Sequence, residues 1–355
     1  MKIIHINTQR CWRGGERQLS WLYEGIEKKG IEQIIFCRKK SKLEAFVIAK
    51  KIPFKSYSIA IYSLFYVAYK LVPLIDKKET IIHCHDSKSH TIALIVRLFF
   101  RVDIKIVVQR KVNFLIKGWF SKNIKYSEKY VNAIFCVSKS VEEMVKKSTG
   151  FRNTTVICDM IKPSEIPSLQ NLYKTNFQIG YIAALTEEKD HITFLNTAKK
   201  IHETHTKIQF FIAGEGKLKE KLQQYADEIG VNEYTHFTGF VNDIPNLIAN
   251  LDLLLFTSKS EGLGSTILDF FMAKKPVVTV KNGGSEELVF NYKTGIICEQ
   301  EDFEELAKAC IELVEKPNLL FTLTENAYKF VSENFSENRI LEQTLAGYRA
   351  ILKNS

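Results

Sequence analysis

The sequence predicts an α/β protein built from two Rossmann-like domains, each a doubly wound parallel sheet, that face one another across a cleft. Short runs of branched apolar residues alternate with amphipathic helical patterns along most of the chain, which is typical of parallel sheets covered on both faces. An irregular stretch interrupts this alternation, and 355 residues with 45% apolar content suffice for two ordinary cores. We expect ligands at the carboxyl ends of the strands.

The first half of the chain predicts an N-terminal domain over residues 1–165. We expect buried strands at Lys2–Asn7, Ile31–Cys37, Thr80–Cys84, Ile104–Gln109 and Ala133–Val137. Amphipathic helices are expected at Glu16–Lys29 and Lys88–Phe100. Strands that alternate with helices at this spacing indicate a doubly wound domain.

The alternation restarts after an irregular stretch and predicts a C-terminal domain over residues 166–336. The best linker candidate is Cys158–Asn176, which holds two of the seven prolines. Further strands are expected at Phe177–Ala183, Lys207–Ala213, Leu251–Phe256 and Pro276–Val280. Helices are expected at His191–Thr204, Lys217–Ile229 and Ser265–Met272, and helical segments follow from Asp302 onward.

Charge is divided unevenly between the halves. Met1 to Glu165 contains 31 Lys and Arg against 14 Asp and Glu, a net charge of +17, whereas the remainder has 19 against 26, a net charge of −7. We expect the basic half to face an anionic membrane surface or a phosphorylated, lipid-linked substrate; a solvated basic face is the alternative. Nucleic acid is not expected as a partner, because no helix-turn-helix, zinc-finger or RNP-type motif accompanies the charge.

Two aromatic-rich segments lie in the basic half. For Ile59–Ile75 we favour packing in the core over contact with a bilayer, whereas for Phe114–Tyr126 contact with a membrane or an acceptor is as good an interpretation as packing. The chain shows no secretory leader and no long uncharged apolar run, so we expect a cytoplasmic protein, at most peripheral on the inner face of the membrane. Its seven scattered cysteines form no C-x-x-C pair and are expected to be reduced.

Two motifs in the first half follow predicted strands. In "RGGERQLS", Gly14 and Gly15 would let backbone amides at a helix N-terminus approach an anionic ligand; a tight turn without a ligand is the alternative. In "HCHDSKSH", His85 is placed for a hydrogen bond to a substrate or for a structural role. A metal site is not expected, because His83 and His85 have no third ligand at matching spacing.

Two motifs in the second half carry charge next to predicted helices. Lys189, in "AALTEEKDH", could reach a phosphate group as a point charge or could be an ordinary surface lysine. In "SKSEGLGSTILDFF", the amides of Gly264, Ser265 and Thr266 open a helix and could bind an anion. Carboxylates at Glu261 and Asp269 flank these amides. They would repel phosphate alone but would accept hydrogen bonds from the hydroxyls of a nucleotide sugar.

The combination of these motifs resembles the retaining glycosyltransferases of family 4, which have the two-domain GT-B fold. The resemblance rests on "WRGGERQL", "IIHCHDSKSHTIAL", the long segment from "FFIAGEGKL" to "FFMAKKPVV", "NGGSEELV" and the closing "FSENRILEQTLAGYRAIL". It implies that the first domain binds the acceptor, that the second binds the nucleotide sugar, and that the last helix, residues 337–355, returns to the first domain.

The same resemblance implies residue roles. Glu261 would bind hydroxyls of the donor sugar, Asp269 the ribose, and Lys189 the diphosphate, while His85 would lie beside the transferred sugar. The implied catalytic residues are His85, Lys189 and Glu261. The implied donor-binding residues are Gly14, Gly15, Arg110, Lys189, Phe240, Val241, Glu261, Gly262, Leu263, Gly264, Ser265, Thr266 and Asp269.

Three positions depart from the family pattern. Asp269 replaces the usual Glu, Ala184 stands where many members have Arg, and Asp190 replaces a glycine. We hypothesise that Arg110 or Lys111 supplies the cation missing at Ala184.

The resemblance implies a metal-independent, cofactor-free hexosyltransferase that moves a sugar from a nucleotide diphosphate sugar, UDP-linked in our expectation, to an acceptor hydroxyl with retention of configuration. We expect an acceptor in cell-envelope glycan, lipopolysaccharide or glycolipid synthesis. Two alternatives are a sugar-nucleotide epimerase of the same fold and a catalytically silent, membrane-associated scaffold.

Overall fold

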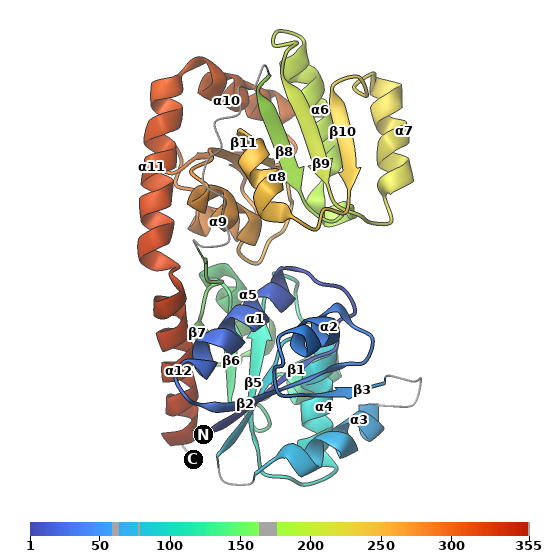
Figure 1. Cartoon of the computed structure of the whole chain (residues 1–355), viewed down its shortest axis with the longest axis vertical. Helices are drawn as coiled ribbons and strands as arrows, with labels where there is room; N and C mark the ends of the chain where they lie inside the picture. Colours follow the sequence, from blue (N-terminus) through green and yellow to red (C-terminus); the bar gives the residue numbers. More distant parts are fainter. Residues whose placement is uncertain (59–63, 77–78, 163–175, 354–355) are drawn as a thin grey trace. The chain divides into compact units, whose positions relative to one another are not determined.

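The computed structural model describes residues 1–58, 64–76, 79–162 and 176–353 and divides the chain into two compact units. The first unit comprises Met1–Met160 and Glu337–Ser355, and the second comprises Ile161–Ser336 (Figure 1). Most of the linker candidate, and with it the 165/166 boundary, lies outside the described residues.

The first unit contains a sheet of parallel strands. Its strands are β1 (Lys2–Asn7), β2 (Glu32–Arg38), β3 (Phe54–Tyr57), β4 (Thr80–Cys84), β5 (Lys105–Arg110), β6 (Ala133–Cys136) and β7 (Thr154–Val156). Its α-helices are α1 (Gly14–Glu27), α2 (Lys42–Ala49), α3 (Leu64–Leu71), α4 (Ser87–Leu98), α5 (Lys139–Thr149) and α12 (Glu337–Lys353). The strand order, β3-β2-β1-β4-β5-β6-β7, reverses direction at β1 and is that of a doubly wound sheet.

The last helix of the chain completes the core of the first unit. Leu341, Leu345 and Tyr348 of α12 belong to the same buried cluster as Trp21 of α1 and Phe135 of β6. Figure 1 shows α12 beside α1. Two glycines permit this close packing. A Cβ at Gly25 of α1 would lie 3.1 Å from the Leu341 side chain, and one at Gly347 would lie 2.7 Å from the Phe135 ring.

The second unit repeats the doubly wound architecture. Its strands are β8 (Gln178–Ile182), β9 (Gln209–Ala213), β10 (Thr235–Gly239), β11 (Leu253–Phe256), β12 (Val277–Val280) and β13 (Ile296–Cys298). Its α-helices are α6 (His191–His202), α7 (Lys219–Ile229), α8 (Ile244–Asn250), α9 (Ser265–Met272), α10 (Phe303–Glu315) and α11 (Pro317–Asn334). The parallel strands follow the order β10-β9-β8-β11-β12-β13.

The structure confirms the predicted fold class. The predicted strands Lys2–Asn7 and Thr80–Cys84 and the predicted helix Ser265–Met272 match the observed bounds, and the other predicted strands and helices are found with ends shifted by a few residues. Strands β3, β7, β10 and β13 were not predicted. Three of them have only three or four residues, and β3, β7 and β10 are less buried than the central strands. Among the described residues, no helix is both long enough and apolar enough to span a bilayer.

Candidate functional site

Loops that follow four strands of the second unit meet at the carboxyl edge of its sheet. The amide of Ala183, after β8, donates to the carbonyl of Ala213 at the end of β9 at 3.0 Å. The amide of Gly214 in turn donates to the carbonyl of Gly239 at the end of β10 at 2.8 Å. Gly214 has a φ of +151°, and a Cβ there would lie 1.9 Å from the carbonyl oxygen of Ala183, so only glycine fits this crossing.

The loop that carries Lys189 is anchored to β8 and to the residues that follow β11. The Tyr181 hydroxyl donates to the Lys189 carbonyl at 2.7 Å, and the Ser258 hydroxyl donates to the Glu188 carbonyl at 3.0 Å. These bonds bring Lys189 to Glu261, 72 residues later in the chain, with 2.5 Å between Nζ and Oε1. The two side chains are only 21% and 13% exposed. The structure therefore joins two predicted site residues in a largely buried ion pair.

The N-terminus of α9 has the anion-binding form that the sequence predicts. Gly264 precedes the helix with a φ of +90°, and within the described residues the amides of Gly264, Ser265 and Thr266 have no hydrogen-bond partner. Asp269 lies one turn after Ser265 and is half-buried on the same face. This face can therefore offer both amide donors and a carboxylate acceptor to one ligand.

The turn before α9 is packed tightly against a neighbouring loop. Gly262 and Leu263 are buried, and a Cβ on Gly284 would lie 2.7 Å from the Leu263 nitrogen. This contact explains why Gly284, the second glycine in "NGGSEELV", is a glycine, because a side chain at this position would displace the loop that carries Glu261. In contrast, Phe240 and Val241, which follow β10, extend away from the core, and Phe240 is 58% exposed.

The structure gives one departure from the family pattern a physical explanation. Asp190 has a φ of +46°, in the left-handed region where glycine is favoured, and its carboxylate caps α6 by accepting from the amide and hydroxyl of Thr193. Lys259 pairs with Asp190 at 3.5 Å and also with Glu301. The departure at Ala184 leaves no positive charge at a position where many members of the family have Arg.

The glycine loop of the first unit begins α1 at the carboxyl edge of that sheet. Glu16 is 3% exposed; it accepts from the Asn7 amide at 2.8 Å and from the Arg13 backbone amide at 3.0 Å. Burial raises the pKa of Glu16. At Gly15 an added Cβ would meet no atom within 4 Å, so the packing of the described residues does not require glycine there. Both Gly14 and Gly15 are half-buried.

Three histidines meet under this edge. His5 of β1 is in register with His83 of β4, and His85 follows β4. His5 Nδ1 lies 3.0 Å from His85 Nε2, and His83 Nδ1 lies 2.6 Å from the Tyr348 hydroxyl. Burial lowers the pKa of His5 to about 4 and lowers those of His83 and His85 well below their usual value, so all three rings are neutral at pH 7.

The histidine cluster corrects one interpretation of the sequence. A third histidine does lie beside His83 and His85, because strand pairing brings in His5, and one ring nitrogen from each lies within 4.8 Å of the others. The spacing along one strand could not reveal this. His5, and the Gln33 side chain that contacts it, were absent from the predicted site.

The basic pair after β5 is engaged within the first unit. Arg110 donates to the Phe114 carbonyl at 2.7 Å and to the Tyr126 hydroxyl at 3.4 Å. Lys111 forms a 2.6 Å ion pair with Asp159. Both cations thus have partners before any ligand binds, and a diphosphate contact by Arg110 would require its side chain to move.

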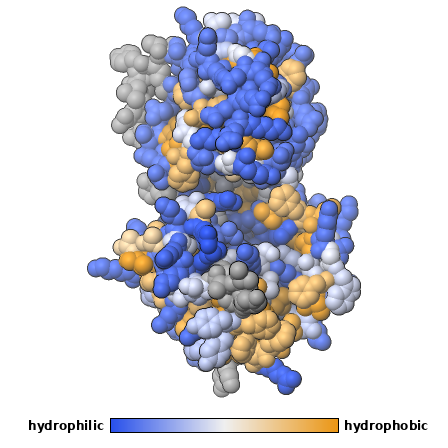
Figure 2. Space-filling model, turned by 90° about the vertical axis from the view of Figure 1, so that its right-hand side faces the viewer, coloured by the Kyte–Doolittle hydropathy of each residue, from blue (hydrophilic) through white to orange (hydrophobic). Residues whose placement is uncertain are grey.

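Exposed aromatic side chains gather on the first unit. On α3, Phe65, Tyr66 and Tyr69 are 50%, 54% and 57% exposed, whereas Val67 and Leu71 are buried. Of the segment Ile59–Ile75, residues 59–63 lie outside the described part of the chain. On α3 the expected core packing holds for the buried face and is wrong for the exposed aromatic rings. Figure 2 shows hydrophobic surface, in orange, in the lower part of the view.

Two neighbours extend this surface of α3. Phe99, just after α4, packs edge-on against Phe65 and is itself 65% exposed. Lys70 adds a positive charge beside Tyr66. The later aromatic segment is exposed as well: Phe114 is 51% exposed and Trp119 is 71% exposed.

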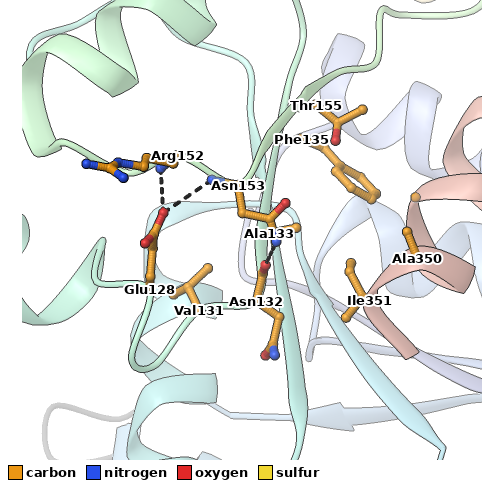
Figure 3. A pocket seen from close by; sticks show the side chains of 11 residues that line it. Glu128, Val131, Asn132, Ala133, Phe135, Arg152, Asn153, Thr155, Ala350 and Ile351 are labelled. Carbon is orange, nitrogen blue, oxygen red and sulfur yellow. Dashed lines mark hydrogen bonds between the residues drawn. The ribbon is translucent and has the colours of Figure 1, made fainter. Parts of the chain in front are cut away.

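A separate cavity of about 470 Å³ lies between β6, the loop before β7, and α12 (Figure 3). Its floor includes Phe135 and Ile351, and at its rim Glu128 accepts from the backbone amides of Arg152 and Asn153. Asn153 precedes β7, so the cavity lies toward the amino ends of the strands. It is therefore at the opposite edge from His85 and is not part of the candidate site.

Two family models together match nearly the whole chain. Residues 12–165 match the model described as glycosyltransferase family 4, and residues 164–330 match the one described as glycosyl transferases group 1. EpsD of Bacillus subtilis (strain 168), named as a glycosyltransferase, is 25% identical over 325 residues, which cover 85% of this chain and 84% of EpsD. The capsular polysaccharide biosynthesis glycosyltransferase CapM of Staphylococcus aureus is 22% identical, with 94% of this chain and 93% of CapM covered.

Solved structures share the fold. The crystal structure of HepE from Anabaena in complex with UDP and glucose superposes with a TM-score of 0.85 at 18% identity, covering 99% of this chain and 100% of HepE.

Proposed function

The chain belongs to the glycosyltransferases of the GT-B fold, and from that premise we propose that it transfers a hexosyl group from a UDP-sugar to a hydroxyl group of a cell-envelope glycan, with retention of configuration. The observation that carries the proposal is the pairing of Lys189 with Glu261 next to the amides that begin α9, which have no partner among the described residues. One cation and several amide donors suit a diphosphate, and a neighbouring carboxylate suits sugar hydroxyls.

Binding of the donor would exchange partners within this site. Lys189 leaves Glu261 for the diphosphate, and Glu261 then accepts hydrogen bonds from the donor sugar. The amides of Gly264, Ser265 and Thr266 bind the phosphate oxygens, and Asp269 accepts from the ribose. The uracil base would lie against Phe240 and Val241, whose exposure leaves room for it. UDP as the nucleotide is supported by the HepE complex with UDP and glucose.

Catalysis in this proposal rests on stabilisation of the leaving group. As the glycosidic bond to the diphosphate breaks, negative charge develops on the phosphate oxygens, where Lys189, released from Glu261, and the amides that begin α9 would stabilise it. These groups make a metal ion unnecessary. The departing phosphate takes the proton of the acceptor hydroxyl on the same face of the sugar, which gives retention without an enzyme nucleophile.

In the first unit, three residues are assigned further contacts with ligands. The open space at Gly15 leaves room for the diphosphate or the acceptor beside the amides that begin α1. His85 would contact the transferred sugar. Arg110 would contribute its charge to the diphosphate after leaving the Phe114 carbonyl.

We assign acceptor binding to the basic first unit, and we propose that this unit rests on an anionic membrane surface. The exposed aromatics of α3 next to Lys70 have the composition of an interfacial helix, since aromatic rings favour the headgroup region and lysines favour anionic lipids. A lipid-linked glycan or lipopolysaccharide precursor is the acceptor class that fits this surface. The relative CapM, named for capsular polysaccharide biosynthesis, supports an envelope polysaccharide.

The test is a thermal-shift panel of UDP, GDP, ADP and CMP on the wild type and on Lys189→Ala. A nucleotide at 100 times its Kd should stabilise the protein by about 2.7 kcal/mol. We expect UDP to do so and Lys189→Ala to abolish the effect. If no nucleotide stabilises the wild type, the donor site is inactive and a catalytically silent scaffold becomes the better interpretation.

A second assay separates transfer from the epimerase alternative. The wild type is incubated with the matching UDP-sugar, with and without membrane-derived lipid acceptors, and the sugar product is analysed. A new glycosidic linkage that depends on the acceptor supports transfer. Release of a free, altered sugar without an acceptor would instead identify an epimerase.

A further inference from the structure

The side-chain amide of Gln33 determines which ring nitrogen of His5 carries the proton. Its Nε2 group donates to the backbone carbonyl of Tyr23 at 2.7 Å. A carbonyl can only accept, so the amide must place its nitrogen there and turn its oxygen toward His5. That oxygen lies 3.2 Å from His5 Nε2 and is also only an acceptor. His5 therefore carries its proton on Nε2.

The position of the proton on His5 determines which ring nitrogen of His85 is protonated. Burial keeps His5 neutral, so its Nδ1 has a lone pair and accepts. The atom 3.0 Å from this Nδ1 is His85 Nε2, which must be the donor. Burial and the neighbouring His83 keep His85 neutral as well. Its remaining nitrogen, Nδ1, therefore has a lone pair.

This lone pair has no partner inside the part of the chain that the structure describes. His5 and Gln33 are buried, whereas His85 is half-buried at the carboxyl end of β4. An unpaired acceptor at the functional edge of the sheet is free to meet a ligand. The groups that set its state lie deeper, on β1 and β2.

We infer that Gln33 and His5 are positioning residues that hold His85 in the Nε2–H tautomer, so that His85 Nδ1 accepts a hydrogen bond from a hydroxyl group of the sugar substrate. This inference rests on the proposed function. It also gives the subsite a chemical preference: a hydroxyl can donate to the lone pair, whereas an ionised carboxylate at the same carbon cannot and would be repelled. A donor with a hydroxymethyl group is therefore favoured over the corresponding uronic acid if this carbon faces His85.

The three histidines could instead be considered as ligands for a metal ion, and the proton positions argue against it. A metal held by His5 Nδ1 and His85 Nε2 would need a lone pair on both atoms. The 3.0 Å contact between these atoms requires one of them to donate a proton. The hydrogen-bond chain and a metal site are thus mutually exclusive, which gives the inference a direct test.

The first measurement is long-range ¹H–¹⁵N NMR on protein labelled with ¹⁵N-histidine, with the His85 signals assigned by His85→Gln. We expect Nε2 protonated and Nδ1 unprotonated in both His5 and His85 at pH 7. A proton on His85 Nδ1 would overturn the inference. So would one equivalent of zinc or cobalt retained by the purified protein.

The second measurement uses Gln33→Met, which keeps the size of the side chain and removes the acceptor for His5. We expect mixed His85 tautomers, a KM for the UDP-sugar raised about tenfold, and an unchanged Kd for UDP, which lacks the sugar. Gln18→Met is the matched control. Gln18 is also buried and bonds both the amide and the carbonyl of Met160, but among the described residues it forms no hydrogen bond with the histidines.

The outcomes separate this inference from the proposed function. Equal effects of Gln33→Met and Gln18→Met on the KM would mean that Gln33 is merely structural, and the inference would fail while transfer stands. If the wild type binds no UDP-sugar, the proposed function fails and the substrate contact of His85 fails with it, whatever tautomer NMR reports.

Discussion

The two units carry different polar clusters at the carboxyl edges of similar sheets. In the first unit the cluster beneath His85 consists of neutral imidazoles joined by hydrogen bonds, and burial holds their pKa values down. In the second unit the cluster is a lysine and a glutamate held in one ion pair. The comparison indicates that one architecture can serve two tasks. A neutral imidazole cluster suits recognition of hydroxyl groups, and a charged pair suits binding and release of a diphosphate.

The largest expected difference between the units is their response to acid. The first unit holds four imidazoles with lowered pKa values, His5, His83, His85 and His90, and the second holds one that the structure identifies, His191. The unfolded chain takes up protons below about pH 6.5, whereas burial keeps these rings neutral: the pKa is about 4 for His5 and His191 and lies well below the usual value for the other three. The unfolded state therefore binds more protons, and stability falls as pH falls below about 6.5. Each ring should cost about 2 kcal/mol between pH 7.5 and 5.

Urea unfolding followed by tryptophan fluorescence measures this response in the first unit alone, because Trp12, Trp21 and Trp119 all lie there. His90→Met removes one titrating group without altering the three-histidine cluster and should flatten the pH dependence. Equal pH slopes for tryptophan fluorescence and for circular dichroism of the whole chain would contradict the difference between the units.

Removal of the cation from the charged pair in the second unit should have the next largest effect. Lys189→Ala leaves the developing diphosphate charge without its cation, so kcat/KM for the UDP-sugar should fall by about 10²- to 10³-fold. The matched control is Lys259→Ala, which removes a nearby lysine that pairs with Asp190 and Glu301. Steady-state kinetics should show a change of less than about threefold for that control. Similar losses in both variants would argue for general surface charge instead of a specific contact.

A smaller effect with an unusual sign is expected for Glu261→Gln. In the free protein Glu261 forms an ion pair with Lys189. Neutralising the carboxylate should break this pair, leave the lysine available to the diphosphate, and tighten UDP binding by about fivefold. Transfer should nonetheless slow, because the amide binds the sugar hydroxyls less well. Calorimetric titration with UDP checks the first effect. Asp269→Asn, which alters the ribose contact, should weaken UDP binding; a similar weakening by Glu261→Gln would rule out the exchange of partners.

The smallest effect concerns the outer surfaces of the units. Replacing Tyr66 and Tyr69 with serine should lower co-sedimentation with phosphatidylglycerol vesicles by about threefold to tenfold, since both rings are more than half exposed on the basic unit. Phe321→Ser on α11 is the control, because Phe321 is 64% exposed on the second unit. Equal loss of binding in both variants would mean that general hydrophobicity, not this face, drives association.

How far the sequence predicts the molecule depends on the range of the contacts involved. Central strands such as β4 are buried along their whole length and stand out as apolar runs, whereas β3 has two exposed residues among four and does not. The α9 turn was predictable because two glycines, a hydroxyl pair and the helix lie within a few residues. His5 was not, since its link to His83 depends on strand register between positions 78 residues apart. Gln33 was missed for the same reason.

The return of α12 to the first unit has a consequence for biosynthesis. The hydrophobic cluster that contains Trp21 and Phe135 is incomplete until Leu345 and Tyr348 have been translated. These two residues leave the ribosome after the whole second unit. The second unit can therefore fold while the chain is still growing, but the first unit, although translated first, reaches its final core last. A chain without α12 would keep the Lys189–Glu261 pair of the second unit. It would lack Tyr348, the hydrogen-bond partner of His83 in the histidine cluster of the first unit.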